Sequence, residues 1–108
     1  MHYEQKDIID FINTFKQTDK QNLEYIFTNG NCYFFALILK ELFTGSHIVF
    51  SQSESHFLVM YDNHLYDILG DRTKEISIYD LYAWEDMKTI DNAYYNRLLR
   101  DCVYLKTR

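Results

Sequence analysis

The sequence predicts an α+β fold in which helices pack on a small antiparallel sheet of three strands. Apolar residues recur at helical spacing before residue 45 and after residue 90, whereas residues 47–70 are rich in strand formers separated by short polar turns. This order of helices, then strands, then helices is typical of α+β layering. The 108 residues suffice for one core, so we expect residues 1–108 to form a single domain.

Two helices are predicted in the N-terminal part of the chain. The first spans residues 3–17, where five apolar residues recur at helical spacing: Ile8, Ile9, Phe11, Ile12 and Phe15. This helix should therefore lay one apolar face on the core. Thr18 and Asp19 should end it, and a second, shorter helix should run from about Lys20 to Phe27.

The third predicted helix starts at Cys32 and is apolar on nearly every side as far as Leu39. Asn31 is a favourable N-cap residue, and Gly30 lets the preceding backbone turn tightly, so the start is well defined. Gly45 is the expected residue just after the end of the helix. A helix this apolar should lie inside the domain and not on its surface.

Residues 47–51 should form the first strand, and residues 55–70 should form a β-hairpin around Asp62 and Asn63. Both turn residues tolerate positive φ, which a two-residue hairpin turn needs. Pairing outward from this turn makes Asp67 the diagonal neighbour of His56 on one face of the sheet. A loop of two or four residues keeps this pair together, whereas a loop of three places Asp67 on the opposite face.

The remaining segments are predicted to be scaffold. Residues 71–75 should form a loop, residues 76–86 a strand remnant followed by a short helix, and residues 91–102 a closing helix. Cys102 is interpreted as a structural residue. A reducing cytosol would keep the two cysteines of the chain as free thiols in preference to a disulfide.

Cys32 is the main candidate for a reactive residue. The N-terminus of a helix carries a partial positive charge and unpaired N–H groups, which favour a thiolate and can stabilise an oxyanion formed beside it. The alternative is that Cys32 is a small buried apolar residue, as cysteines commonly are.

His56 and Asp67 would complete an arrangement of nucleophile, base and orienting acid. An Asp on an apolar strand face is costly unless a group such as an imidazole N–H pairs with it. Asp67 would then orient His56, and the other ring nitrogen of His56 would accept the Cys32 proton. The alternative is that both residues lie at strand ends and are simply solvated.

These residues resemble the papain-like cysteine peptidase superfamily in its compact forms, the NlpC-type cell-wall peptidases and the transglutaminase-like proteins. The resemblance covers residues 29–70, with Cys at the start of a central helix, His on one strand and Asp on the next. It implies that Cys32 attacks an amide or ester carbonyl, that His56 is the base and that Asp67 holds His56. Asn29, Asn31 and the backbone N–H of Cys32 are the candidate oxyanion donors.

No cofactor or metal is expected. The histidines and cysteines lack the close paired spacing of zinc ligands, and no phosphate-binding loop or dinucleotide motif is present. His47 is an alternative base, but no acid on a neighbouring strand is placed to hold it. His64, beside the turn, is expected to be exposed to solvent.

Composition limits the expected partners. A net charge of −5 argues against nucleic acid, and no segment is long and apolar enough for a membrane span. The N-terminus lacks the pattern of a secretory signal, so a cytoplasmic protein is expected. Part of the 10 Tyr and 8 Phe residues should pack the core, and exposed Tyr would suit a protein-binding surface or a peptide cleft.

Two function classes follow from these observations. The first is a small cysteine-dependent hydrolase or acyltransferase that acts on an amide bond of a peptide or protein through Cys32, His56 and Asp67. The second is a non-catalytic protein-binding module on the same fold, for example a small phage or mobile-element protein that inhibits a host system. The substrate, the acyl acceptor and the oligomeric state are left open.

Overall fold

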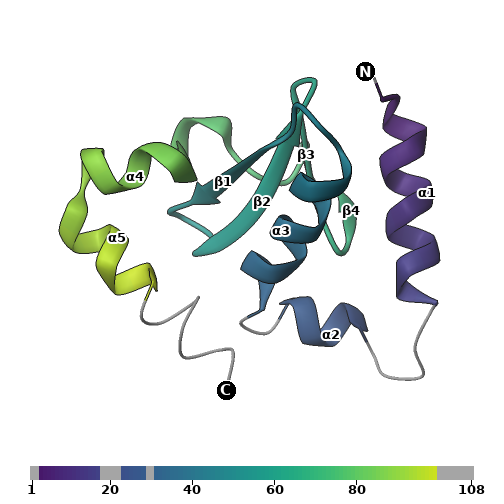
Figure 1. Ribbon diagram of the computed structural model, residues 1–108, viewed down its shortest axis with the longest axis horizontal. Coiled ribbons are helices and arrows are strands. Elements are labelled where there is room, and N and C mark those ends of the chain that lie inside the picture. The colour runs from purple at the N-terminus through teal and green to yellow at the C-terminus, as the bar shows by residue number, and fades with distance from the viewer. Residues whose placement is uncertain (1–2, 18–22, 29–30, 100–108) are drawn as a thin grey trace.

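Helices cover one face and both edges of an antiparallel β-sheet in the computed structural model (Figure 1). The structure describes residues 3–17, 23–28 and 31–99. In chain order its elements are α1 (Gln5–Lys16), α2 (Leu23–Thr28), α3 (Cys32–Leu42), β1 (His47–Ser51), β2 (His56–Tyr61), β3 (His64–Asp67), β4 (Gly70–Asp71), the 3-10 helix η1 (Ile78–Asp80), β5 (Leu81–Ala83), α4 (Trp84–Ile90) and α5 (Asn92–Leu98). The predicted α+β class is confirmed.

The hairpin of β2 and β3 has the predicted turn and register. Asp62 and Asn63 have φ of 49° and 64°, as a two-residue type I′ turn requires. The register pairs Tyr61 with His64, Met60 with Leu65, and Val59 with Tyr66. Because side chains alternate along a strand, the hairpin presents two distinct faces, and His56 and Asp67 belong to the same one.

The sheet has five strands within the described residues, in the order β4-β3-β2-β1-β5, so the prediction of three strands was wrong. Gly70, with φ of 108°, turns the chain back after β3, so that Gly70 pairs with Asp67 and Asp71 with Tyr66. The segment 71–75 is therefore a loop only after its first residue. Strand β5 is the strand remnant expected within residues 76–86, and it joins the sheet beside β1.

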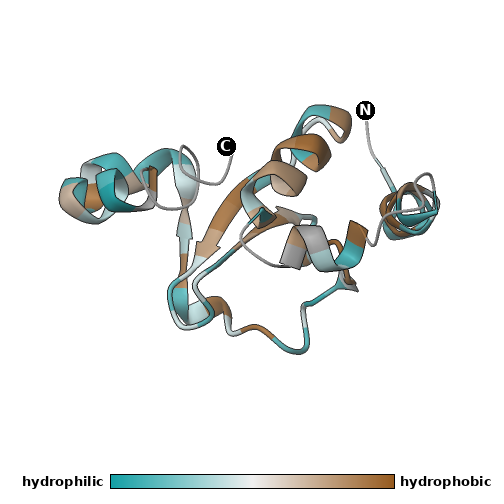
Figure 2. Cartoon of the chain, turned by 90° about the horizontal axis from the view of Figure 1, so that it is seen from below, coloured by the Kyte–Doolittle hydropathy of each residue, from teal (hydrophilic) through white to brown (hydrophobic). Residues whose placement is uncertain are grey.

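The two faces of the sheet are buried by different parts of the chain. The face under α3 belongs to the larger core, whose members include Ile8, Ile12, Phe35, Leu39, Phe50, Phe57, Val59, Tyr66 and Ile68. The opposite face carries a smaller buried cluster: Val49, Leu58, Leu65 and Ile76. Figure 2 shows the hydrophobic colour concentrated on α3 and the strands, while α4 and α5 are largely hydrophilic.

Helix α3 begins at Cys32, as predicted, but it does not lie inside the domain. Phe35, Ala36 and Leu39 are its buried residues, and they form the stripe that packs on the sheet. The opposite side of the helix is more open, and Leu42 is 47% exposed. The helix also ends earlier than expected, so Gly45, with φ of 95°, turns the chain toward β1 and does not directly follow the last helical turn.

The helices at the two edges follow the predictions in outline. Helix α1 buries Ile8 and Ile12, and the Asp7 carboxylate accepts the Glu4 backbone N–H at 2.8 Å at its start. At the other edge, the Asp91 carboxylate caps α5 by accepting the Tyr94 N–H at 3.0 Å. Cys102, the start of the second predicted helix and the end of the closing helix lie outside the described residues.

Candidate active site

Cys32 is the first residue of α3, and its half-buried thiol faces the end of the sheet where β2 begins. The backbone N–H of Phe57 points to the Cys32 Sγ at a distance of 3.5 Å. Asn31 precedes the helix, as predicted, but its side chain does not cap it, because its φ of −114° and ψ of 18° are not the extended conformation of a usual N-cap. The backbone carbonyl of Asn31 still accepts the Phe34 N–H at 3.1 Å in the first turn.

His56 lies between Cys32 and Asp67. Its Nε2 is 2.7 Å from Asp67 Oδ2. Phe57, the next residue along β2, points its backbone N–H at the Cys32 sulfur, so the strand that carries His56 begins beside the thiol. Burial lowers the pKa of His56, but hydrogen bonds to Asp67 and Cys32 and the negative charge on both groups raise the pKa to about 9. At neutral pH the ring is therefore an imidazolium that faces a sulfur atom on one side and a carboxylate on the other.

Asp67 is a buried carboxylate, and both of its oxygens accept hydrogen bonds. Its side chain is 4% exposed. Oδ2 accepts from His56 Nε2 and from Arg72 Nη1, each at 2.7 Å, and Oδ1 accepts the backbone N–H of Leu69 at 2.8 Å. These bonds offset the cost of burying a charge on an otherwise apolar face.

Arg72 is the residue of this site that sequence reasoning missed. It follows β4, and its Nε donates to Glu75 Oε2 at 2.6 Å while Nη1 donates to Asp67. The result is a row of side chains from the start of α3 to the surface, in which the last four alternate in charge: Cys32, His56, Asp67, Arg72 and Glu75. The signal available in the sequence was indirect, since a buried Asp usually needs more than one donor.

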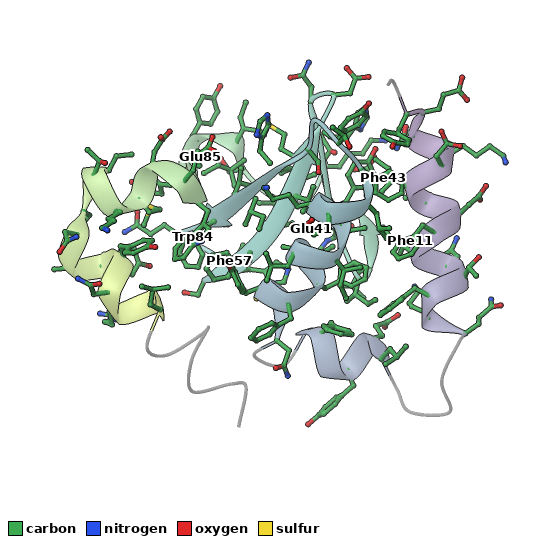
Figure 3. All side chains as sticks on the ribbon, in the orientation of Figure 1. Phe11, Glu41, Phe43, Phe57, Trp84 and Glu85 are labelled. Atoms are coloured by element: carbon green, nitrogen blue, oxygen red, sulfur yellow. The ribbon has the colours of Figure 1, made fainter. Side chains whose placement is uncertain are left out.

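Aromatic rings pack beside this row. Phe57, the residue after His56, lies with its ring 5.0 Å from Tyr33 and 5.0 Å from Trp84, and Trp84 stacks on Tyr95 at 4.7 Å. Figure 3 shows Phe57 and Trp84 side by side near the start of α3. These rings hold α3, β2 and the C-terminal helices together around Cys32 and His56, which gives the site a rigid apolar side.

A groove opens at the same end of the sheet. Ser51 pairs with His56, and Gln52, which follows Ser51, lines a groove of about 450 Å³ between β1 and α5. Asp91, Ala93, Tyr94 and Arg97 complete its lining. The groove is polar as well as aromatic, and it is the kind of concave surface that holds part of a ligand.

The other predicted site residues lie apart from this row or outside the described residues. Asn29 lies outside them. His47 is exposed at the opposite end of β1 from Ser51, roughly 13 Å along the strand, so it does not serve as an alternative base. Among the described residues, no three His, Cys, Asp or Glu side chains are grouped to hold a metal ion.

His64 is less free than expected. Its Nδ1 lies 3.0 Å from Asp71 Oδ2, and Gln5 and Thr73 also donate to the Asp71 carboxylate. Burial raises the pKa of Asp71, but the bonds from Thr73 and His64 outweigh it and lower the pKa below its usual value. This second His–Asp pair joins α1 to the β4 edge, and its bonded partners include the Thr73 hydroxyl, which lies 3.4 Å from His64 Nδ1.

A comparison with known protein families shows to which family the chain belongs. Residues 8–101 match the family described as Phage YunG-like protein, which is most of the chain. The chain belongs to the Phage YunG-like family. No curated protein and no solved structure matches it.

Membership in the Phage YunG-like family corrects the predicted resemblance to the papain-like superfamily. No peptidase family, curated peptidase or peptidase structure supports that resemblance, so it was wrong. A Cys, a His and an Asp on a helix and a hairpin are too few residues to establish descent, since the same constellation recurs on unrelated folds. The Phage YunG-like family instead associates the chain with phages. No helix in the described part of the chain is long and apolar enough to cross a membrane.

Proposed function

We propose that this phage-associated protein is a cysteine-dependent hydrolase or acyltransferase that acts on an amide bond. The observation that supports it is the hydrogen bond of His56 to the buried Asp67, at the end of the sheet where the Phe57 backbone N–H meets the Cys32 sulfur. A nucleophile, a base and an orienting acid in contact are the minimum that thiol-based acyl transfer needs. This proposal rests on the geometry of the site and needs no common descent with peptidases.

In the proposed reaction, the Cys32 sulfur attacks the carbonyl carbon of the amide, and a C–S bond forms. His56 takes up the proton that the sulfur gives up and passes it to the leaving amine as the C–N bond breaks. Water or a second amine then attacks the thioester and gives a proton to His56; the C–S bond breaks, and the proton passes from His56 back to the Cys32 sulfur. The N-terminus of α3 places its partial positive charge beside the sulfur, where an oxyanion would form.

Acyl-enzyme trapping tests this proposal directly. The protein, with Cys102→Ser to remove the second thiol, is mixed with pools of peptides, isopeptides and glutamine amides, quenched in acid and examined by mass spectrometry. The expected result is an acyl adduct on Cys32 that is absent in Cys32→Ala. Absence of any adduct, together with ordinary slow alkylation of Cys32 at neutral pH, would contradict the proposal.

A protein-binding function is the second candidate, and family membership favours it. Small phage proteins can act by occupying a host protein, and η1 offers two adjacent exposed apolar side chains for that purpose. Ile78 is 59% exposed and Tyr79 is 93% exposed, beside the short edge strand β5. Exposed aromatic and apolar residues at a sheet edge are typical of protein contacts.

Two substitutions separate the candidates. Cys32→Ala should abolish the effect of an enzyme and leave the affinity of a binding module for its partner unchanged. Tyr79→Ser should do the opposite, because Tyr79 belongs to the exposed surface and not to the row of site residues. A phage-linked growth or inhibition phenotype that survives Cys32→Ala and is lost with Tyr79→Ser would favour binding.

A further inference from the structure

Arg72 and His56 meet at a single oxygen atom. Arg72 Nη1 and His56 Nε2 each lie 2.7 Å from Asp67 Oδ2. Two positively charged groups on one buried carboxylate oxygen repel each other. Asp67 therefore attracts each of them more weakly than it would attract that group alone. The Asp67 carboxylate therefore binds Arg72 as well as His56.

The backbone around Arg72 holds this geometry. Its N–H donates to the Leu65 carbonyl at 2.7 Å, and its own carbonyl accepts from Glu75 and Ile76 at 3.0 and 3.2 Å. The backbone N–H of Leu69, in the turn before β4, donates to the other carboxylate oxygen of Asp67, Oδ1. Strand β4 thus returns the chain so that the Arg72 guanidinium reaches the same oxygen of Asp67 that His56 contacts.

Few charged groups surround His56. Those that the described structure brings to it are Cys32 from α3 and Asp67 from β3, with Arg72 behind Asp67 and Glu75 behind Arg72. Glu75 is 61% exposed, so solvent screens its charge more than that of the others. Among these groups, Arg72 is the positive charge that can weaken the hold of Asp67 on the His56 proton.

We propose that Arg72 is a positioning residue of the active site, which fixes the Asp67 carboxylate and limits how tightly the Asp67–His56 pair retains its proton. The inference rests on the proposed function, in which His56 must release that proton to the leaving amine and then accept another. A histidine that held its proton too tightly would be a poor acid in the first step and an unavailable base in the second. Arg72 would set this balance without touching the substrate.

Titration of His56 tests the inference without any need for activity. The ring of His56 is followed by NMR against pH in the full chain with Cys102→Ser, and Arg72→Met is compared with Arg72→Lys. Loss of the guanidinium charge should tighten proton binding to His56 on the order of tenfold. Arg72→Lys keeps a positive charge and should bring the titration most of the way back.

The direction of the shift separates positioning by charge from a purely structural role. If Arg72 only held the turn together, its loss would free Asp67, and proton binding to His56 would weaken; that result, or no change, would overturn the inference. Glu75→Gln, on an exposed side chain, provides a second test should Arg72→Met fail to fold. This substitution removes the second carboxylate partner of Arg72, so the attraction between Arg72 and Asp67 becomes stronger. Proton binding to His56 should then weaken about twofold, and tighter or unchanged binding would count against the inference.

The same variants keep the failure of the inference apart from the failure of the proposed function. The alkylation rate of Cys32 against pH is recorded beside the NMR titration. A shifted His56 titration in a protein that forms no acyl-enzyme supports the inference about Arg72 and contradicts the proposed reaction. A protein that forms an acyl-enzyme, and whose His56 titration is the same in the wild type and in Arg72→Met, supports the proposed reaction and contradicts the inference about Arg72.

Discussion

The Phe57 backbone N–H lies 3.5 Å from the Cys32 sulfur, although the two residues are 25 positions apart in the chain. Phe57 directly follows His56, so this contact ties the start of α3 to the strand that carries the histidine. An N–H group pointed at sulfur favours negative charge there, as does a helix N-terminus. The backbone of β2 thereby fixes the Cys32 thiol beside the start of the strand that carries the His56 imidazole.

Removal of the imidazole should slow the reaction of Cys32 with iodoacetamide. In His56→Ala the thiolate loses the adjacent imidazolium, so the alkylation rate at neutral pH should fall on the order of tenfold or more. The rate is measured by mass spectrometry from about pH 5 to about pH 9 in the Cys102→Ser background. His64→Ala is the matched control, since His64 pairs with Asp71 and not with the thiol. Equal rates in the wild type and His56→Ala would show that Cys32 is not activated by His56.

Neutralising Asp67 should make His56 easier to deprotonate. Asp67→Asn keeps the size of the side chain but removes the charge that helps to raise the pKa of His56 to about 9, so the titration should move down by about one unit. The midpoint is read from the His56 ring signals by NMR. Asp71→Asn is a matched control, because it removes an equal charge from the other His–Asp pair. A midpoint that Asp71→Asn moves as far as Asp67→Asn does would point to a general charge effect.

The sequence predicts those parts of the fold in which several local signals agree. The hairpin is one such part, because Asp62 and Asn63 tolerate positive φ and the flanking strands alternate correctly around them. Strand β4 is not, because two residues are too few for alternation to show. Gly70 permits the tight turn that brings β4 back onto β3, but a turn residue followed by a single further residue does not by itself indicate a strand.

The candidate site likewise has one contact that the sequence predicts and one that it does not. The His56–Asp67 contact follows from the register of one hairpin, so it was predictable from local pattern alone. Arg72 lies in a polar run that is typical of a loop, and its contact with Asp67 exists only because β4 folds back. The wrong assignment to the papain-like superfamily has a related cause, since residue types at suitable spacing describe chemistry but not ancestry.

The turn offers a test of the hairpin that is independent of the site. Asn63 has φ of 64°, where glycine is unstrained, so Asn63→Gly should stabilise the protein by a few tenths of a kcal/mol to about 1 kcal/mol. Asn63→Val should destabilise it by about 1–2 kcal/mol, since a β-branched residue is strained in the left-handed region. Both values come from urea unfolding. Equal stability of the two variants would contradict the turn geometry described above.

Stability should fall as the pH rises from about 6.5 to about 9. The pKa of His56 is raised from 6.5 to about 9 in the folded protein, so the folded state binds this proton more tightly than the unfolded state does. The resulting stabilisation is complete below pH 6.5 and is lost as the pH passes through 9, at a cost on the order of 2–3 kcal/mol. Urea unfolding in reducing buffer from about pH 6 to about pH 10 would measure it.

Two variants assign this loss of stability to its source. His56→Gln cannot bind the proton, so its free energy of unfolding should lack the fall across this pH window, while its stability below pH 6.5 should be lower than that of the wild type. His64→Gln removes the other paired histidine, whose side chain is 39% exposed, and should keep the fall. If His56→Gln lost stability with pH as steeply as the wild type, the proton involved would not be the one shared between His56 and Asp67, and the charged row that begins at Cys32 would have to be reassigned.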